Sequence, residues 1–211
     1  MLAALRSIFR GFRDDQRGSV LVEMTISIVL LLILTLGFVD FGYAYYQWNA
    51  ASKAVQVGAR LAAISDPVVN ALAASTDTPP TVNDVGKAVP IGQFSYTCLG
   101  AGSPACNANF DRIYRGDTTG TGCPALGANQ RPGMCHIFPR LQPQNIRVTY
   151  SASGLGYWTR PGGPIPTITV SLEGLTFQFF FLSGLLGFND ITMPSMLSTV
   201  TGEDMRSTAP S

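Results

Sequence analysis

The sequence predicts an α+β fold, in which a long N-terminal transmembrane and amphipathic helix packs on a small C-terminal antiparallel β-sheet, with a disulfide-stapled loop region. Three observations predict it. An apolar run over Val20–Phe41 continues without proline until Pro67. Four cysteines lie in a middle segment rich in turn residues, and apolar and polar residues alternate in the C-terminal third. The 211 residues allow one anchor and one modest domain.

The apolar run predicts one membrane span. It supplies the roughly 20 helical residues that cross the hydrocarbon core, and Met24–Val39 carries no charge. Positively charged flanks stay on the cytoplasmic side, so we expect the N-terminus inside and the C-terminus outside. The span is too long for a secretory signal, and no small-residue cleavage site follows it cleanly. The flank before the span carries four arginines, Arg6, Arg10, Arg13 and Arg17.

The helix is expected to continue beyond the membrane, to about residue 65. Apolar residues recur there at three- and four-residue steps, which places them on one helical face. These residues are Tyr46, Ala50, Ala54, Val57, Leu61 and Ile64. An aromatic belt is expected where the helix leaves the bilayer, formed by Tyr43, Tyr45, Tyr46 and Trp48.

A strip of small residues follows the same helix at four-residue steps: Ala50, Ala54, Gly58 and Ala62. Such a strip allows close packing, which gives a reason for a glycine that costs about 1 kcal/mol relative to alanine inside a helix. The strip could receive the helix of another subunit or the chain's own sheet. We favour the chain's own sheet for Ala54–Ala62, and both can hold on different faces.

The four cysteines all follow the span and therefore face an oxidising compartment, where an even number favours two disulfides. Three pairings are possible, and the shorter loops favour Cys98–Cys106 and Cys123–Cys135. A zinc site of all four thiolates is the alternative, which the absence of a C-x-x-C pair disfavours.

Local patterns predict the remaining elements. Thr81–Asp84 resembles a helix start, which predicts a short helix over Asn83–Val89, and Cys98–Cys135 is predicted as a long loop with one or two short strands. Period-2 alternation predicts strands over Asn145–Ala152 and Pro166–Gly174. A third strand is expected over Leu197–Met205, completing a meander.

The segment Phe177–Phe188 is unusually rich in phenylalanine and leucine for a connection. We expect it to fill the core as a strand or helix end. The alternative is an exposed apolar patch that contacts a neighbouring subunit or the membrane surface.

Glu23 is a carboxylate at the start of an apolar helix, where it needs a partner or a role. The residues from Arg17 to Glu23, RGSVLVE, resemble the prepilin cleavage motif of type IV and related pili. Ala54–Ala62 is similar to a helical turn of TadE/TadG-family pseudopilins. The chain therefore resembles a minor pilin of the Tad (tight adherence, Flp) system.

The resemblance implies a processed precursor. Residues 1–18 would be a cytoplasmic leader, 19–65 the N-terminal helix and 66–211 an extracytoplasmic pilin-like domain. A prepilin peptidase would cut between Gly18 and Ser19. The Glu23 carboxylate would then pair with the N-terminal ammonium of an adjacent subunit. Ser19 stands where many type IV pilins have a methylated phenylalanine, and the long body favours a minor rather than a major pilin.

The implied partners are the prepilin peptidase, other pilin subunits, the pilus assembly machinery and the inner (cytoplasmic) membrane. The protein would be a single-pass membrane protein before assembly and reach the pilus or periplasm afterwards. It would contribute to pilus biogenesis, adhesion and surface attachment. The alternative is an uncleaved single-pass membrane protein with an extracytoplasmic binding domain.

Composition and motifs argue against other classes. The formal net charge is +1, and positive residues are not clustered beyond the N-terminal flank, so we expect no nucleic-acid partner. The single histidine, His136, adjoins Cys135, but neighbours in sequence rarely meet as nucleophile and base. Neither metal-ligand spacing nor a phosphate loop occurs, so we expect no cofactor, no metal and no enzyme.

Overall fold

The computed structural model describes residues 16–73, 81–100, 103–159, 164–187, 191–203 and 205, and omits the side chains of 16, 17, 185 and 186. The chain divides into two compact units. One unit comprises Met1–Ala44 and Gln178–Asp190, and the other comprises Tyr45–Phe177 and Ile191–Ser211. Most of the predicted leader, including Arg6, Arg10 and Arg13, lies outside the described residues.

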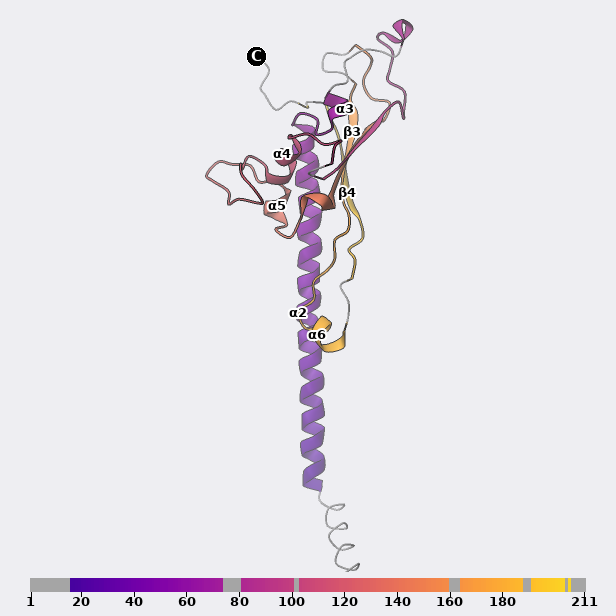
Figure 1. The fold of residues 1–211 in the computed structure, drawn as a ribbon. Coiled ribbons are helices and arrows are strands. Elements are labelled where there is room, and N and C mark those ends of the chain that lie inside the picture. Colours follow the sequence, from indigo (N-terminus) through magenta and orange to yellow (C-terminus); the bar gives the residue numbers. More distant parts are fainter. Residues whose placement is uncertain are drawn as a thin grey trace, which may run out of the picture. The chain divides into compact units, whose positions relative to one another are not determined.

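The long helix α2 spans Gln16–Ala63 and contributes to both units (Figure 1). Its bounds confirm the predicted continuous helix, which has no internal proline. Within the described part of the chain, this is the one helix long and apolar enough to cross a membrane. None of its most apolar stretch is buried, as expected for a surface that lipid would cover.

The larger unit contains a four-stranded antiparallel sheet in the order β1-β2-β3-β4. The strands are β1 (Ser95–Leu99), β2 (Ile146–Ala152), β3 (Pro166–Leu172) and β4 (Met196–Thr201). In β2 and β3 every second residue is buried, so the predicted alternation is confirmed. The meander is also confirmed, although β4 ends before the predicted Met205. Strand β1 was not predicted.

The core of this unit lies between one face of the sheet and the C-terminal part of α2. The helix contributes mainly alanines, and the sheet contributes larger side chains. Its fully buried members include Ala51, Ala54, Ala62, Val148, Tyr150, Ile168 and Val170. Small residues on the helix let its backbone approach the sheet closely, because the bulky strand residues already fill the space.

The middle of the chain contains short helices. They are α3 (Asn70–Ala73), η1 (Val82–Asp84), α4 (Phe110–Arg115), α5 (Met134–Ile137) and η2 (Pro143–Asn145). The predicted helix over Asn83–Val89 is wrong. Thr81 and Asp84 bond through their side chains at 2.6 Å, but the following residues pair with another segment through a bridge between Ala88 and Tyr157.

Two disulfides, Cys98–Cys106 and Cys123–Cys135, connect this middle segment. They are the two short-loop pairs that the sequence favours. The loop between Cys98 and Cys135 contains α4 and the first half of α5 in place of the expected extra strands, although β1 reaches Leu99. The backbones of Gly116 and Gly133 pass so closely that a Cβ on Gly133 would meet the backbone of residues 114–116. Only glycine fits such a crossing.

Candidate functional site

One face of the N-terminal half of α2 contains the residues of the predicted cleavage motif. Gly18, Ser19 and Glu23 line this face with Val22, Ile26 and Ser27, since residues three or four apart share a side of a helix. All six residues are exposed. The face therefore places small and polar groups beside the Gly18–Ser19 peptide within an otherwise apolar helix.

Two hydroxyl side chains of this stretch bond to the helix itself, whereas Glu23 does not. Thr25 and Thr35 donate their hydroxyl groups to the carbonyls of Leu21 (2.7 Å) and Leu32 (2.9 Å). None of the described side chains forms an ion pair or hydrogen bond with Glu23. The hydroxyl groups of Thr25 and Thr35 are thus bonded within the helix, and the Glu23 carboxylate is available to a group from outside.

The strip of small residues lies inside the larger unit. Ala50, Ala54, Gly58 and Ala62 are all buried. A Cβ on Gly58 would collide with Sδ of Met134 and lie 2.9 Å from its Cγ. Packing against the chain's own domain is therefore the role that the structure gives the strip.

The predicted apolar face of this part of α2 needs a correction at its ends. Tyr46 and Ile64 were expected on the packed face but are exposed. The buried face is rotated towards Ala51, Val55 and Ala59. The prediction placed large residues at both ends of the packed face, whereas the side of the helix that packs against the sheet is the one with mainly small residues.

Asp40 is a site residue that the sequence analysis did not identify. Its fully buried carboxylate accepts hydrogen bonds from the backbone N–H groups of Phe180 (3.0 Å), Phe181 (2.9 Å) and Leu182 (2.7 Å). These are donors at the start of α6 (Leu182–Leu186), where helical N–H groups lack partners within the helix. The sequence signal was its isolation, because Asp40 is the only charged residue between Glu23 and Lys53.

The Phe-rich segment does not fill the core along its whole length. Phe177 packs against the core and stacks on Trp48, with ring centroids 6.3 Å apart. Phe180 and Phe181 are 61% and 42% exposed, so the core-filling expectation is wrong for these two residues. Asp40 accepts the backbone N–H groups of these two residues, whose rings are exposed.

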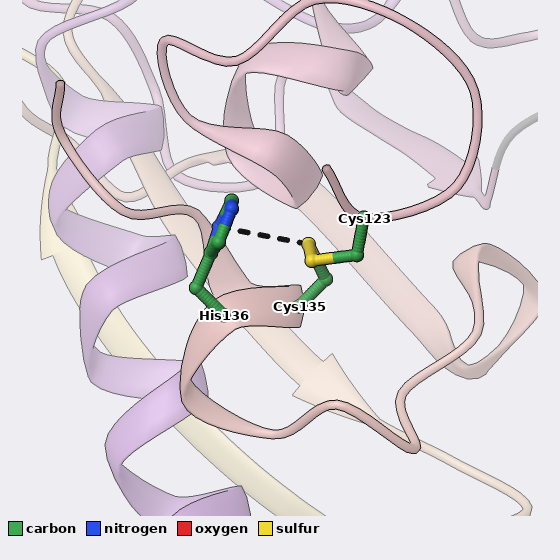
Figure 2. Close-up of side chains that lie close together, drawn as sticks. All are labelled: Cys123, Cys135 and His136. Atoms are coloured by element: carbon green, nitrogen blue, oxygen red, sulfur yellow. Dashed lines mark hydrogen bonds between the residues drawn. A yellow bond between two sulfur atoms is a disulfide. The ribbon is translucent and has the colours of Figure 1, made fainter. Parts of the chain in front are cut away.

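A second cluster joins Cys123, Cys135 and His136, whose donor atoms lie within 4.8 Å of one another (Figure 2). The sulfur atoms are bonded to each other, and His136 Nδ1 lies 3.6 Å from the Cys135 sulfur. Nδ1 accepts the N–H of Gly133 (3.1 Å), so Nε2 carries the proton and donates it to the carbonyl of Pro124 (2.8 Å). The structure therefore forms disulfides in place of the alternative zinc site.

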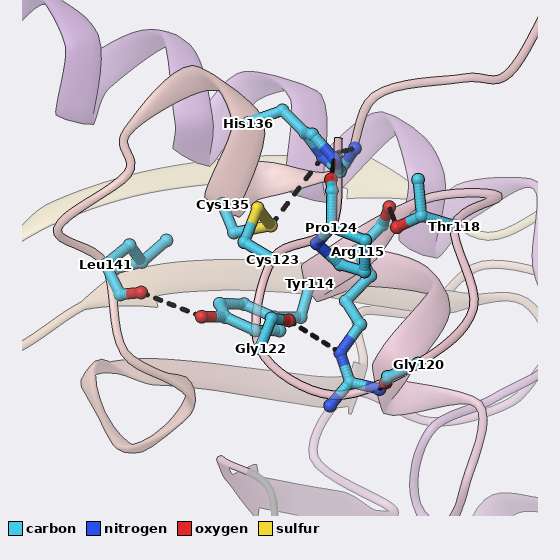
Figure 3. Close-up of a disulfide and its surroundings, with 11 residues drawn as sticks. Tyr114, Arg115, Thr118, Gly120, Gly122, Cys123, Pro124, Cys135, His136 and Leu141 are labelled. Carbon is cyan, nitrogen blue, oxygen red and sulfur yellow. Dashed lines mark hydrogen bonds between the residues drawn. A yellow bond between two sulfur atoms is a disulfide. The ribbon is translucent and has the colours of Figure 1, made fainter. Parts of the chain in front are cut away.

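Side chains from α4 bond to the segments that precede and follow this disulfide loop (Figure 3). Arg115 donates to the carbonyls of Gly120 and Gly122, and the Tyr114 hydroxyl donates to the carbonyl of Leu141 at 3.0 Å. Burial raises the pKa of Tyr114 above its usual range, and the charge of Arg115 partly opposes this effect.

Asp117, between α4 and Cys123, has a lowered pKa. The backbone N–H of Arg131 (3.0 Å) is the largest cause, and the guanidinium of Arg131 adds to it. These contacts stabilise the loop and bring no nucleophile or base together. That the protein is not an enzyme therefore remains a prediction from the sequence.

Comparison with known proteins adds one finding at the N-terminal helix. Residues 18–60 match the family model described as TadE-like protein. The match begins at Gly18 and covers the Glu23 face, Asp40 and most of the strip of small residues. No curated protein and no solved structure matches the chain.

Proposed function

We propose that the chain, whose N-terminal segment matches a TadE-like model, is associated with the Tad pilus and is a minor pilin of that system. It is made as a single-pass membrane precursor with its N-terminus in the cytoplasm. A prepilin peptidase cuts it between Gly18 and Ser19. The cleaved subunit then joins other pilin subunits through the N-terminal half of α2 and contributes to pilus biogenesis, adhesion and surface attachment.

The observation that carries this proposal is the TadE-like match, which begins at the residue before the proposed scissile bond. The geometry of α2 supports it. Gly18, Ser19 and Glu23 share one exposed face, and Glu23 has no partner among the described side chains. A carboxylate in an apolar environment is costly unless a positive group neutralises it. The ammonium freed at Ser19 of a neighbouring subunit is such a group.

Cleavage is tested by replacing Gly18 with leucine and determining the N-terminus of the membrane-extracted protein by mass spectrometry. A side chain at Gly18 meets no other atom within 4 Å, so the substitution leaves the helix intact and acts on recognition by the peptidase. We expect the parent protein to begin at Ser19 and the variant to keep its leader.

Gly42→Leu is the matched control. Gly42 lies in the same helix, is exposed, and likewise has no atom within 4 Å of an added Cβ, so this variant should be processed normally. If the parent protein still begins at Met1, the alternative of an uncleaved single-pass protein with an extracytoplasmic binding domain replaces the proposal.

The pairing role of Glu23 is tested separately from cleavage. Glu23→Ala should be processed normally but be lost from the pilus fraction sheared from cells, because the buried ammonium of its neighbour would have no counter-charge. Ser27→Ala, one turn further along the same face, is the control and should assemble. Normal assembly of Glu23→Ala would remove Glu23 from the mechanism.

A further inference from the structure

The loop Gln178–Gly187 is held against the N-terminal part of α2 within the smaller unit. Asp40 binds it through the three backbone N–H groups at the start of α6. Two ring contacts add to this attachment. The rings of Phe179 and Phe41 meet edge to face, with centroids 6.4 Å apart, and the ring centroids of Phe180 and Tyr43 are 4.8 Å apart. The loop is therefore fixed at one position along the helix, at the end of its apolar run.

The attached loop exposes apolar side chains. Phe180 is largely exposed and Phe181 partly so, and Phe38, Val39 and Phe41 are exposed on the neighbouring helix surface. The segment from Phe177 to Phe188 contains no charged residue. The exposed rings thus extend the apolar surface that α2 presents along its span, and an apolar surface that continues a lipid-facing one matches lipid rather than water.

The polar groups of the loop are satisfied in the way that a lipid environment requires. Unpaired backbone N–H groups are costly where water is excluded, and Asp40 accepts three of them. The hydroxyl of Ser183 donates to the carbonyl of Phe179 (3.0 Å), and the N–H of Gly187 donates to the carbonyl of Ser183 (3.1 Å). The loop therefore exposes the rings of Phe180 and Phe181, while the backbone N–H groups of residues 180, 181, 182 and 187 are hydrogen-bonded within the protein.

We propose that the loop Gln178–Gly187 is a second membrane contact of this protein, in which Phe180 and Phe181 insert into the bilayer interface beside α2 and Asp40 holds the loop at that depth. The partner is the lipid itself, at the boundary between headgroups and acyl chains, where aromatic side chains are favoured. The inference requires that α2 crosses the membrane, and it does not require cleavage at Gly18.

The test uses the full-length chain in phosphatidylcholine vesicles whose acyl chains carry bromine, which quenches nearby tryptophan fluorescence. Phe180→Trp adds a reporter to the native Trp48 and Trp158, and Phe181→Trp serves as a second position. We expect the added emission to be quenched more by bromine near the headgroup end of the acyl chain than by bromine near its terminal methyl. Aqueous acrylamide should quench it weakly.

Leu197→Trp is the control, because Leu197 is 65% exposed on β4 in the other unit. Its added emission should respond to acrylamide and not to bromine. If both added tryptophans at the loop behave like this control, the proposal is wrong. If they resist both quenchers, protein covers the loop, as in contact with a second copy of the chain, and the proposal is also wrong.

The role of Asp40 is tested by adding Asp40→Asn to the Phe180→Trp variant. An amide has one acceptor oxygen and presents its own N–H₂ group to the backbone donors, so the three hydrogen bonds cannot all persist. We expect the bromine quenching of the added tryptophan to fall and its acrylamide quenching to rise, while the variant still fractionates with membranes. Unchanged quenching would show that Asp40 does not hold the loop.

Discussion

Tyr150 is a fully buried phenol on β2 whose oxygen accepts the backbone N–H of Val68 at 3.3 Å. Burial raises the pKa of Tyr150 from 10.0 to about 12, and the hydrogen bond from Val68 partly opposes this shift. The folded protein therefore disfavours the phenolate more than the unfolded chain does. The contribution of Tyr150 to the free energy of unfolding is fully present below pH 10 and is lost as the pH rises towards 12.

The free energy of unfolding should consequently fall by about 1.4 kcal/mol per pH unit in this window. Denaturant unfolding of the detergent-solubilised protein from pH 9 upwards measures this slope. Tyr150→Phe should reduce the slope and cost about 1 kcal/mol at neutral pH, because the N–H of Val68 loses its acceptor. Tyr157→Phe, at a more exposed tyrosine, should do neither, and an equal alkaline slope in both variants would contradict the assignment to Tyr150.

Gly58 and Gly42 predict opposite effects of the same substitution within α2. Gly42→Ala meets no neighbouring atom and should stabilise the helix by about 0.5–1 kcal/mol. Gly58→Ala drives its Cβ into the buried side chain of Met134, and overpacking costs about 1–3 kcal/mol. Thermal unfolding followed by circular dichroism measures both variants. A stabilised Gly58→Ala would mean that Met134 moves aside.

The Cys123–Cys135 disulfide predicts how the middle segment responds to reduction and to metal. Replacing both cysteines with serine should cost about 2–4 kcal/mol of stability, because the unfolded chain regains the freedom of that loop. The oxidised protein should bind no stoichiometric zinc, since both sulfur atoms are bonded to each other and both nitrogens of His136 are hydrogen-bonded. Equilibrium dialysis measures zinc, and one equivalent bound without reduction would overturn this prediction.

Elements with long regular patterns could be predicted from the sequence, and the others had weaker signals. The apolar run and helical period gave α2, and strict alternation gave β2 and β3. Strand β1 buries only Cys98 fully and shows no alternation, so it looked like part of a loop. Helices of four to six residues, such as α4 and α5, are too short to show a period.

The candidate site was predictable where side chains carry the signal. Gly18, Ser19 and Glu23 follow from a local motif. The role of Asp40 does not follow from a local motif, because its partners are backbone N–H groups 140 to 142 residues away in sequence. Every residue except proline has a backbone N–H, so such partners leave no signal in the sequence. The exposure of Phe180 matches the alternative of an exposed apolar patch rather than the favoured core-filling role, and a run of phenylalanines and leucines alone does not distinguish the two.

At the scale of the molecule, the division into two units predicts that the larger one folds alone. A chain beginning at Tyr45, with Gln178–Asp190 replaced by a short Gly-Ser linker, keeps the core, the sheet and both disulfides. Exported to an oxidising compartment, it should be monomeric without detergent and unfold cooperatively. Size-exclusion chromatography and calorimetry measure this.

The matched form that keeps Gln178–Asp190 but still begins at Tyr45 should behave differently. It lacks Asp40, so the N–H groups of residues 180–182 lose their acceptors while the exposed rings remain. We expect it to aggregate or to require detergent. If both forms are equally soluble, the loop is not an apolar surface that depends on α2.

The meander has a consequence for the timing of export. Each strand bonds only to its neighbours in sequence, so a chain threaded across a membrane delivers every strand next to a partner that has already arrived. No pair of strands that has already formed must separate to admit a later strand. The edge of β3 stays unpaired until β4 (Met196–Thr201) has crossed, so a chaperone that protects unpaired strands would be needed only up to that point.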